Sequence, residues 1–240
     1  MRHSMTIKDS ILSTDTTITG IVFDLDGTLV DSAPDITDAI NLMLASHDIA
    51  PQRVDFVERF IGEGSFGLVH KLYKGLGMSL DPGRVAADVE RYLSFYRLQP
   101  VRLSTVFADA LVAIPALHAA GLKLGICTNK AQLLAESVLR HFDLHRYFCA
   151  IVGGDALEVR KPDPGHLLET LDRMAVAPTQ ALFIGDTNID AECACRAGVR
   201  YRIVDWGTGK HVPVEPDMRL GVFGELLACR GVPSLTKQPG

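Results

Sequence analysis

ITGIVFDLDGTLV, residues Ile18–Val30, joins a hydrophobic run to a polar turn that carries two carboxylates. The segment Ile18–Asp24 is rich in β-branched residues and predicts a buried strand. A loop is predicted after it, over Asp24–Ser32, and in this loop Asp24 and Asp26 lie two positions apart. Two aspartates this close resist simultaneous ionisation without a nearby cation, which suggests a divalent metal, a shared proton, or both. A solvated acidic turn is the alternative for an isolated pair.

Strands and helices alternate in the second part of the chain, which is typical of parallel βαβ units. The expected strands are Leu122–Cys127, Cys149–Val152, Ala181–Gly185 and Arg200–Val204. The expected helices are Ala108–Ala120 (with a kink or early break at Pro115), Ala131–Phe142, Asp163–Met174 and Ile189–Ala197. The predicted fold class is therefore α/β, with a Rossmann-like parallel sheet as the core.

A segment without a predicted strand separates the first strand from the others. Helical spacing covers residues 35–47, 54–61, 68–76 and about 82–98. We therefore expect an inserted helical cap domain at 33–100 and a core at 18–32 plus 101–229, with an N-terminal segment 1–17 and a tail 230–240. Ligands of open α/β sheets lie at the carboxyl ends of the strands, so the insertion is placed to cover that face.

Composition excludes several classes of protein. The chain of 240 residues is 47% hydrophobic and 22% charged, which is ordinary for a globular protein. Its 24 basic and 29 acidic residues give a net charge of −5, without a basic block that would fit nucleic acid or a membrane surface. Apolar runs stop short of the roughly 20 residues that span a bilayer, and no signal peptide is predicted. Five cysteines without redox or zinc spacing indicate reduced thiols, and the cytoplasm is the expected location.

Three more polar clusters follow predicted strands. Thr128 and Asn129 could offer a hydroxyl and backbone amides to phosphate, or simply cap a helix. Lys161 precedes a proline that holds its backbone extended, although an isolated lysine is more often on the surface. Asp186 and Asp190 provide hard oxygen ligands that suit Mg²⁺, with a helix N-cap as the alternative. The shared placement at strand ends predicts one site.

The four motifs, in this order, resemble those of the haloacid dehalogenase superfamily of phosphotransferases, over about residues 20–227. Within this superfamily, five strings are similar to phosphoglycolate phosphatases: FDLDGTLVDSAPD (Phe23–Asp35), TNK (Thr128–Lys130), GGD (Gly153–Asp155), RKPDP (Arg160–Pro164) and IGD (Ile184–Asp186). The resemblance implies a core of the haloacid dehalogenase type with a helical cap.

The resemblance also implies catalytic roles. Asp24 would be the nucleophile that forms an aspartyl-phosphate, and Asp26 would protonate the leaving alcohol and then activate water. Thr128 and the backbone of Asn129 would hold phosphate oxygens, and Lys161 would stabilise the charged nucleophile and phosphoryl group.

A magnesium ion is the implied cofactor. It would bind Asp24, the carbonyl of Asp26 and Asp186, and Asp190 would support these ligands from behind. The resemblance also places Gly62 and Glu63 on the cap, where relatives contact the leaving group. Glu63 could equally be solvated, and an acid facing the substrate would weaken the case for a substrate with a second anion.

The expected function is Mg²⁺-dependent hydrolysis of a phosphomonoester through an aspartyl-phosphate, with 2-phosphoglycolate as the leading substrate. Asp26 argues against a dehalogenase, because halide leaves without a proton. A pyrophosphatase, a nucleotidase and a sugar-phosphate phosphatase or mutase resembling β-phosphoglucomutase remain alternatives, as does a catalytically silent binding protein on the same scaffold. The expected partner is a small phosphorylated metabolite, not nucleic acid or a membrane, and the chain is a monomer or homodimer.

Overall fold

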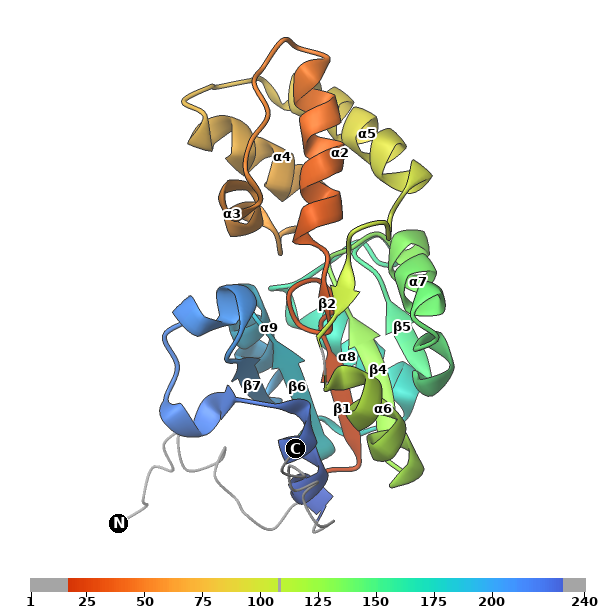
Figure 1. Ribbon diagram of the computed structural model, residues 1–240. Coiled ribbons are helices and arrows are strands. Elements are labelled where there is room, and N and C mark those ends of the chain that lie inside the picture. The colour runs from red at the N-terminus through yellow and green to blue at the C-terminus, as the bar shows by residue number, and fades with distance from the viewer. Residues whose placement is uncertain (1–16, 108, 231–240) are drawn as a thin grey trace, which may run out of the picture.

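A six-stranded parallel sheet forms the centre of the computed structural model, which describes residues 17–107 and 109–230 (Figure 1). The strand order is β5-β4-β1-β6-β7-β8. The strands are β1 (Gly20–Phe23), β4 (Lys123–Cys127), β5 (Ala150–Val152), β6 (Ala181–Gly185), β7 (Arg200–Val204) and β8 (Arg219–Leu220). This architecture confirms the predicted α/β class. The sequence did not predict β8, because a pair of residues shows no periodicity.

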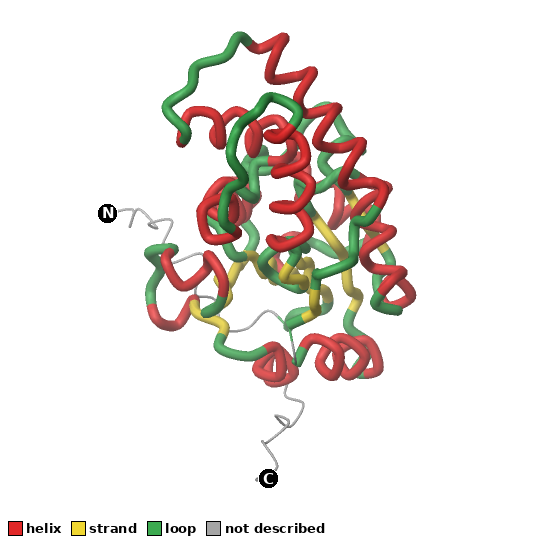
Figure 2. The backbone as a smooth tube through the Cα atoms, turned by 45° about the horizontal axis from the view of Figure 1, so that its top comes forward, coloured by secondary structure: helices red, strands yellow, loops and turns green. Residues whose placement is uncertain are grey.

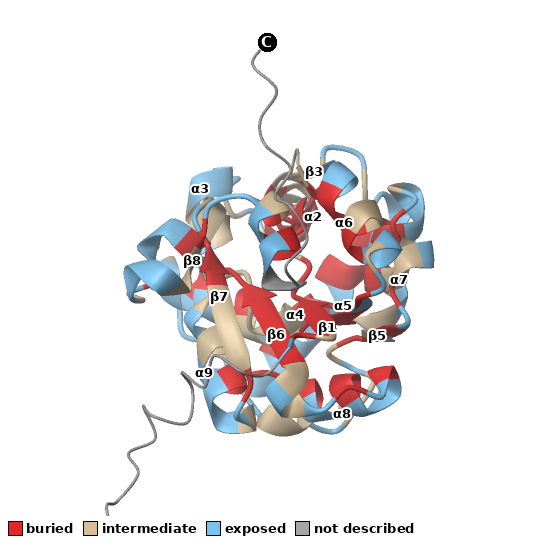
Figure 3. Cartoon of the chain, turned by 90° about the horizontal axis from the view of Figure 1, so that it is seen from below, coloured by how far each residue is buried: buried red, intermediate tan, exposed pale blue. Residues whose placement is uncertain are grey.

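Alternating side chains of the strands pack against helices on opposite faces of the sheet. Ile21 and Phe23 of β1 face α6 (Ala110–Ala119), α7 (Gln132–His141) and a C-terminal 3-10 helix at Phe223–Arg230. Val22 faces α8 (Pro164–Met174) and α9 (Asn188–Ala197) on the other side. Figure 3 shows the buried strands between these two layers. The hydrophobic core is therefore split between two faces of a three-layer sandwich.

Helix α6 continues through Pro115, where a kink or early break was expected, and ends at Ala119. A proline removes the N–H that would bond to the carbonyl four residues earlier, which here is Leu111. Leu111 is exposed, so water can take the place of that lost partner. Ala108, the first residue of the predicted helix, lies outside the described residues.

A second group of helices lies over the carboxyl ends of the strands, as Figures 1 and 2 show from two directions. It comprises α2 (Ala33–Ala45), α3 (Val54–Val57), α4 (Gly64–Gly75) and α5 (Pro82–Leu98), and we name it the helical unit. A 3-10 helix at Glu58–Phe60 follows α3, where one continuous helix was predicted. The helical unit has its own hydrophobic cluster, in which Met43, Leu72 and Tyr96 are almost completely buried.

Two crossings of the chain connect the helical unit to the sheet. Strand β2 (Val30–Asp31) pairs antiparallel with β3 (Thr105–Val106). A loop was predicted at β2, and no element was predicted at β3. Asp35, at the start of α2, accepts hydrogen bonds from the backbone N–H groups of residues 102, 103 and 104 and from the hydroxyl of Ser104. This buried carboxylate holds the outgoing and returning segments together. The predicted terminal segments 1–17 and 230–240 lie outside the described residues, apart from residues 17 and 230.

Candidate active site

The ends of neighbouring strands bring the sequence-predicted residues to one place. Asp24 directly follows β1, Thr128 follows β4 and Asp186 follows β6. Lys161 lies in the connection between β5 and α8. The turn after β1 approaches Asp186 closely at Gly27, whose φ is +81° and where a Cβ would lie 2.3 Å from Asp186 Oδ2. Only glycine fits there without displacing that carboxylate.

Lys161 forms ion pairs with two aspartates of the site. Its Nζ lies 2.9 Å from Asp24 Oδ1 and 2.7 Å from Asp190 Oδ1, and all three side chains are buried. Burial raises the pKa of Asp24 to about 6, and the charge of Asp190 adds to this rise while Lys161 opposes it. Burial alone would lower the pKa of Lys161, but the charges of Asp190 and Asp24 outweigh it and raise that pKa. The ammonium therefore stays charged beside the nucleophile candidate.

Asp190 uses both of its oxygens for positioning. One oxygen, Oδ2, accepts from the backbone N–H of Thr187 at 3.0 Å and from the Thr187 hydroxyl at 2.6 Å. The N–H of Asp190 in turn donates to Thr187 Oγ1, which completes a capping box at the start of α9. The other oxygen faces Lys161. Asp190 thus ties the lysine to the start of α9.

Asp186 is buried among hydroxyl groups. Its Oδ1 accepts from Thr28 Oγ1 at 3.0 Å, and its Oδ2 accepts from Thr208 Oγ1. Burial raises the pKa of Asp186 well above its ordinary value, and the charges of Asp190 and Asp24 act in the same direction. Neither threonine was assigned a role from sequence. Thr28 belongs to the DLDGT string, but Thr208 lies in a 3-10 helix at Gly207–His211, after β7, where no motif was recognised.

The donor set fits a divalent cation. Asp24, Asp186 and Asp190 place ligand oxygens within 4.8 Å of one another, and all three are buried. They face one buried ammonium, that of Lys161, so two negative charges remain without a partner in the cluster. Buried charges need compensation, and Mg²⁺ prefers carboxylate and carbonyl oxygens. Asp24 and Asp186 directly follow β1 and β6 and are candidate ligands, whereas Asp190 pairs with Lys161 through one oxygen and caps α9 with the other.

Asp26 is held on the other side of the site. Its Oδ1 accepts from Ser32 Oγ at 2.6 Å, and Lys130 Nζ lies 2.9 Å from Oδ1 and 3.2 Å from Oδ2. The ammonium of Lys130 also donates to the hydroxyl of Tyr96 on α5 at 2.7 Å. In the sequence, Lys130 is only the third residue of the TNK string, and its pairing with Asp26 was not predicted.

Thr128 and Asn129 begin the turn after β4. Thr128 is buried, and its Oγ1 accepts from the N–H of Lys130 at 3.3 Å. The amide of Asn129 donates to the carbonyl of Gly62 at 2.8 Å and to the carbonyl of Lys161 at 3.0 Å. Asn129 therefore connects the helical unit, the turn after β4 and the segment that carries Lys161.

The structure separates the two predicted residues of the helical unit. Gly62 lines the same cavity as Asp24 and Asp26. Glu63 instead lies in a different hollow, where it is paired with Lys71 and about one-third exposed. Arg59 lines that second hollow as well. A conflict between Glu63 and a second anion on the substrate does not arise in this arrangement.

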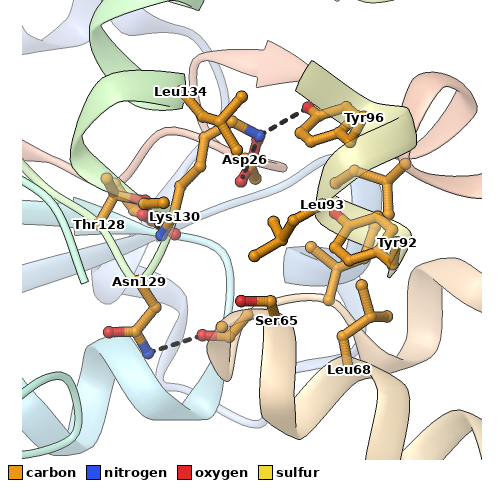
Figure 4. Close-up of a pocket in the computed structure, with 16 residues that line it drawn as sticks. Asp26, Ser65, Leu68, Tyr92, Leu93, Tyr96, Thr128, Asn129, Lys130 and Leu134 are labelled. Atoms are coloured by element: carbon orange, nitrogen blue, oxygen red, sulfur yellow. Dashed lines mark hydrogen bonds and ion pairs between the residues drawn. The ribbon is translucent and has the colours of Figure 1, made fainter. Parts of the chain in front are cut away.

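The cavity between the helical unit and the sheet has a volume of about 40 Å³, room for about three water molecules. Its polar end is formed by Asp24, Asp26, Thr128 and Asn129. Figure 4 shows the opposite wall, where aromatic and aliphatic side chains of α4 and α5 lie across from Asp26. That wall and its surroundings contain Ile36, Leu68, Tyr92, Leu93, Tyr96 and Leu134. Such a cavity suits a small ligand with one strongly polar end.

Comparisons with known proteins agree with this geometry. The model of the haloacid dehalogenase-like hydrolase family matches residues 21–204. The chain is 39% identical over 209 residues to the phosphoglycolate phosphatase of Rhodospirillum rubrum, covering 85% of this chain and 86% of that protein. It is 33% identical over 218 residues to phosphoglycolate phosphatase 1 of Pseudomonas aeruginosa, covering 87% of this chain and 78% of that protein.

Solved structures show the same fold. The crystal structure of a predicted phosphoglycolate phosphatase from Haemophilus somnus superposes with a TM-score of 0.79 at 27% identity, covering 89% of this chain and 98% of that one. Among the described residues, no helix combines the length and apolar character needed to cross a membrane.

Proposed function

The chain belongs to the haloacid dehalogenase-like hydrolases and is a phosphatase of that family, and we propose that it hydrolyses small phosphomonoesters through an aspartyl-phosphate, with 2-phosphoglycolate as the leading substrate. One observation carries the proposal: Asp24 and Asp26 of the turn after β1 converge with Lys161 of the segment between β5 and α8, and both aspartates line one cavity. The names of the relatives supply the substrate class.

In the first step, a carboxylate oxygen of Asp24 attacks phosphorus while the bond from phosphorus to the ester oxygen breaks. Asp26 gives its proton to the departing alkoxide. The phosphoryl oxygens are held by Thr128 Oγ1, the backbone of Asn129 and Lys161. Lys161 is already fixed by Asp190 at 2.7 Å, so little reorganisation is needed when charge moves toward phosphorus.

In the second step, Asp26 removes a proton from water, and the hydroxide attacks the phosphorus of the aspartyl-phosphate. The bond between phosphorus and Asp24 breaks, which releases phosphate and restores the carboxylate. Asp24, Asp186 and the carbonyl of Asp26 would hold Mg²⁺. The ion supplies positive charge that offsets the two unpaired negative charges of the cluster and those of the phosphate.

The cavity supports a small leaving group over the alternatives. At about 40 Å³, it is much smaller than the several hundred Å³ typical of sites for larger ligands. Any phosphomonoester exceeds this volume, so the helical unit must move away from the sheet to admit substrate, and a nucleoside or a hexose would require a larger displacement than a two-carbon leaving group. A catalytically silent binding protein is disfavoured because Asp24, Asp26, Thr128, Lys161 and Asp186 are all present and converge.

The test is phosphate release in the presence of Mg²⁺ from 2-phosphoglycolate, pyrophosphate, several sugar phosphates and nucleotides. We expect a preference for 2-phosphoglycolate of about a hundredfold, equivalent to about 2.7 kcal/mol of transition-state discrimination. Asp24→Asn should abolish turnover, and Asp172→Asn on the exposed face of α8 is the matched control. Wild-type turnover by Asp24→Asn would contradict the mechanism. Isomerised product that depends on a bisphosphate primer would instead identify a mutase.

A further inference from the structure

Lys130 is a buried cation that the phosphate chemistry does not use. Its side chain is 4% exposed, and its ammonium lies between Asp26 of the core and Tyr96 of α5 (Figure 4). The ammonium also lies 4.6 Å from the centre of the Tyr96 ring. Lys161, by contrast, is already committed to Asp24 and Asp190. Lys130 is therefore the positive charge beside the part of the cavity that receives the leaving group.

The hydrogen-bonding capacity around Lys130 is not exhausted. An ammonium has three donors, and here one carboxylate and one hydroxyl are its partners. The hydroxyl of Tyr96 accepts from Lys130, so its own O–H remains able to donate to another acceptor. Burial and the charge of Asp26 raise the pKa of Tyr96, which keeps that proton in place. The ammonium of Lys130 and the hydroxyl of Tyr96 can therefore both donate to an acceptor that lies next to Asp26.

Lys130 is the only cationic side chain among the described residues that line the cavity, and Ser65 and Tyr92 are the other hydroxyl-bearing side chains of that wall. Leu68, Leu93 and Leu134 contribute apolar surface to the cavity. Arg59 and Lys71 line a second hollow with Glu63, which Asp186 also lines, and Arg160 lies behind Gly64, where its Nη1 would be 3.3 Å from an added Cβ. An anionic group on the leaving alcohol would therefore meet Lys130 and Tyr96, and a neutral group would leave their donors unused.

We propose that Lys130 and the hydroxyl of Tyr96 form a carboxylate subsite, which selects phosphomonoesters that carry a carboxylate next to the ester-bearing carbon. The inference rests on the proposed phosphatase function and assigns its substrate preference to two residues. It makes Lys130 a specificity-determining residue that touches the substrate, in addition to its contact with Asp26.

Distances favour a short leaving group. Asp26 must contact the ester oxygen to protonate it, and Lys130 Nζ lies 2.9 Å from Asp26 Oδ1. In a two-carbon leaving group the carboxylate carbon is two bonds from the ester oxygen. Its oxygens can then reach Nζ while the ester oxygen stays on Asp26. A longer chain would carry the carboxylate past Lys130 into the apolar wall.

Binding provides a test that does not depend on turnover. Titration calorimetry with Mg²⁺ present compares 3-phosphonopropionate, a non-hydrolysable analogue of phosphoglycolate, with its uncharged amide of the same size. We expect wild type to bind the acid about tenfold to a hundredfold more tightly, as for a hydrogen-bonded charge. Lys130→Met should remove the difference, and Lys74→Met on the exposed face of α4 should keep it.

Two results would overturn the inference. Equal affinity of wild type for the acid and the amide would show that no carboxylate subsite exists. Equal weakening of both ligands by Lys130→Met would show that the lysine acts only through Asp26. Thermal unfolding checks that Lys130→Met is folded. Tyr96→Phe provides a milder variant, in which affinity for the acid alone should fall severalfold, and loss for both ligands counts against the subsite.

Turnover measurements distinguish failure of the carboxylate subsite from failure of the proposed function. Wild type should hydrolyse 2-phosphoglycolate faster than 2-phosphoglycolamide, measured as kcat/KM, and Lys130→Met should narrow that ratio. If wild type hydrolyses both esters equally, the phosphatase function stands and the subsite fails. If wild type hydrolyses no phosphomonoester, the proposed function is wrong. The difference in affinity between the acid and the amide still tests whether the carboxylate subsite exists.

Discussion

Asp190 holds the ammonium of Lys161 at 2.7 Å with one carboxylate oxygen while its other oxygen caps α9. One side chain thus ties the start of a helix to the charge beside the nucleophile candidate. The link explains why two residues 29 positions apart can act as one unit. A substitution of Asp190 that keeps the capping oxygen but removes the negative charge can therefore test the two roles separately.

Asp190→Asn should lower kcat by about a hundredfold, because loss of a fixed charge partner of Lys161 costs a few kcal/mol in the transition state. An asparagine oxygen can still cap α9, so the free energy of unfolding should change little. Thr187→Ala is the matched control, since it removes the capping hydroxyl and should cost about 1 kcal/mol of stability. The measurements are urea unfolding and steady-state kinetics. Unchanged kcat in Asp190→Asn would show that Asp24 alone positions Lys161.

The metal-free protein should lose stability as pH rises from about 4 to about 6 because of Asp24. Its pKa is raised from 3.8 to about 6, so the folded state binds more protons than the unfolded state in this window. Stability then falls with rising pH, by about 3 kcal/mol for a shift of this size. Burial lowers the pKa of His166 to about 4, which acts in the opposite direction. The difference between wild type and Asp24→Asn isolates the contribution of Asp24.

Mg²⁺ should reverse this loss at neutral pH. We expect about 2.7 kcal/mol of stabilisation at a free concentration about 100 times Kd, and less at pH 5, where Asp24 is largely protonated. Thermal unfolding in chelator and in Mg²⁺ at pH 5 and pH 7.5 measures the effect. Asp24→Asn and Asp186→Asn should each weaken it, whereas Asp172→Asn should not. Equal stabilisation of all three variants would place the ion elsewhere.

Asn129→Leu should raise KM by about tenfold, because removal of a bridging hydrogen bond costs about 1 to 3 kcal/mol. The variant loses the bonds to the carbonyls of Gly62 and Lys161 and thereby loosens the helical unit and the segment of Lys161 from the turn after β4. Asn41→Leu is the control: Asn41 makes a similar bond, to the carbonyl of Gln52, but within the helical unit. It should destabilise the protein and leave KM unchanged. A matching rise in KM for both variants would mean that general loosening, not the bridge, controls binding.

Asp35→Ala should destabilise the protein by about 3 kcal/mol, because three backbone N–H groups and the hydroxyl of Ser104 lose a buried, charged acceptor. The returning chain at residues 102–104 would then no longer be held against α2. Asp38→Ala provides the comparison, since Asp38 pairs with Arg102 at the surface and should contribute about 1 kcal/mol or less. Denaturant unfolding of the two variants gives both values. Similar losses would show that the contacts of Asp35 are weaker than their burial implies.

Local pattern was enough to predict most elements of the core. Strand β6 matches the predicted range, and α9 differs from it by one residue at its start. Pairing of β2 with β3 was missed because each has only two residues, which is too short for any periodicity. The end of α3 at Val57 was missed as well, since a 3-10 turn has nearly the same apolar spacing as an α-helix.

The sequence by itself determined the order of strand-end motifs and therefore the gathering of Asp24, Thr128 and Asp186, because parallel strands place their carboxyl ends at one edge. Only the tertiary structure decided what faces those residues from the helical unit. Lys130 meets Tyr96 across 34 positions and Asp26 across 104, and Glu63 points into a separate hollow. These contacts depend on how the hydrophobic cluster of the helical unit packs relative to that of the sheet. This relative placement cannot be predicted from the hydrophobic periodicity of either segment.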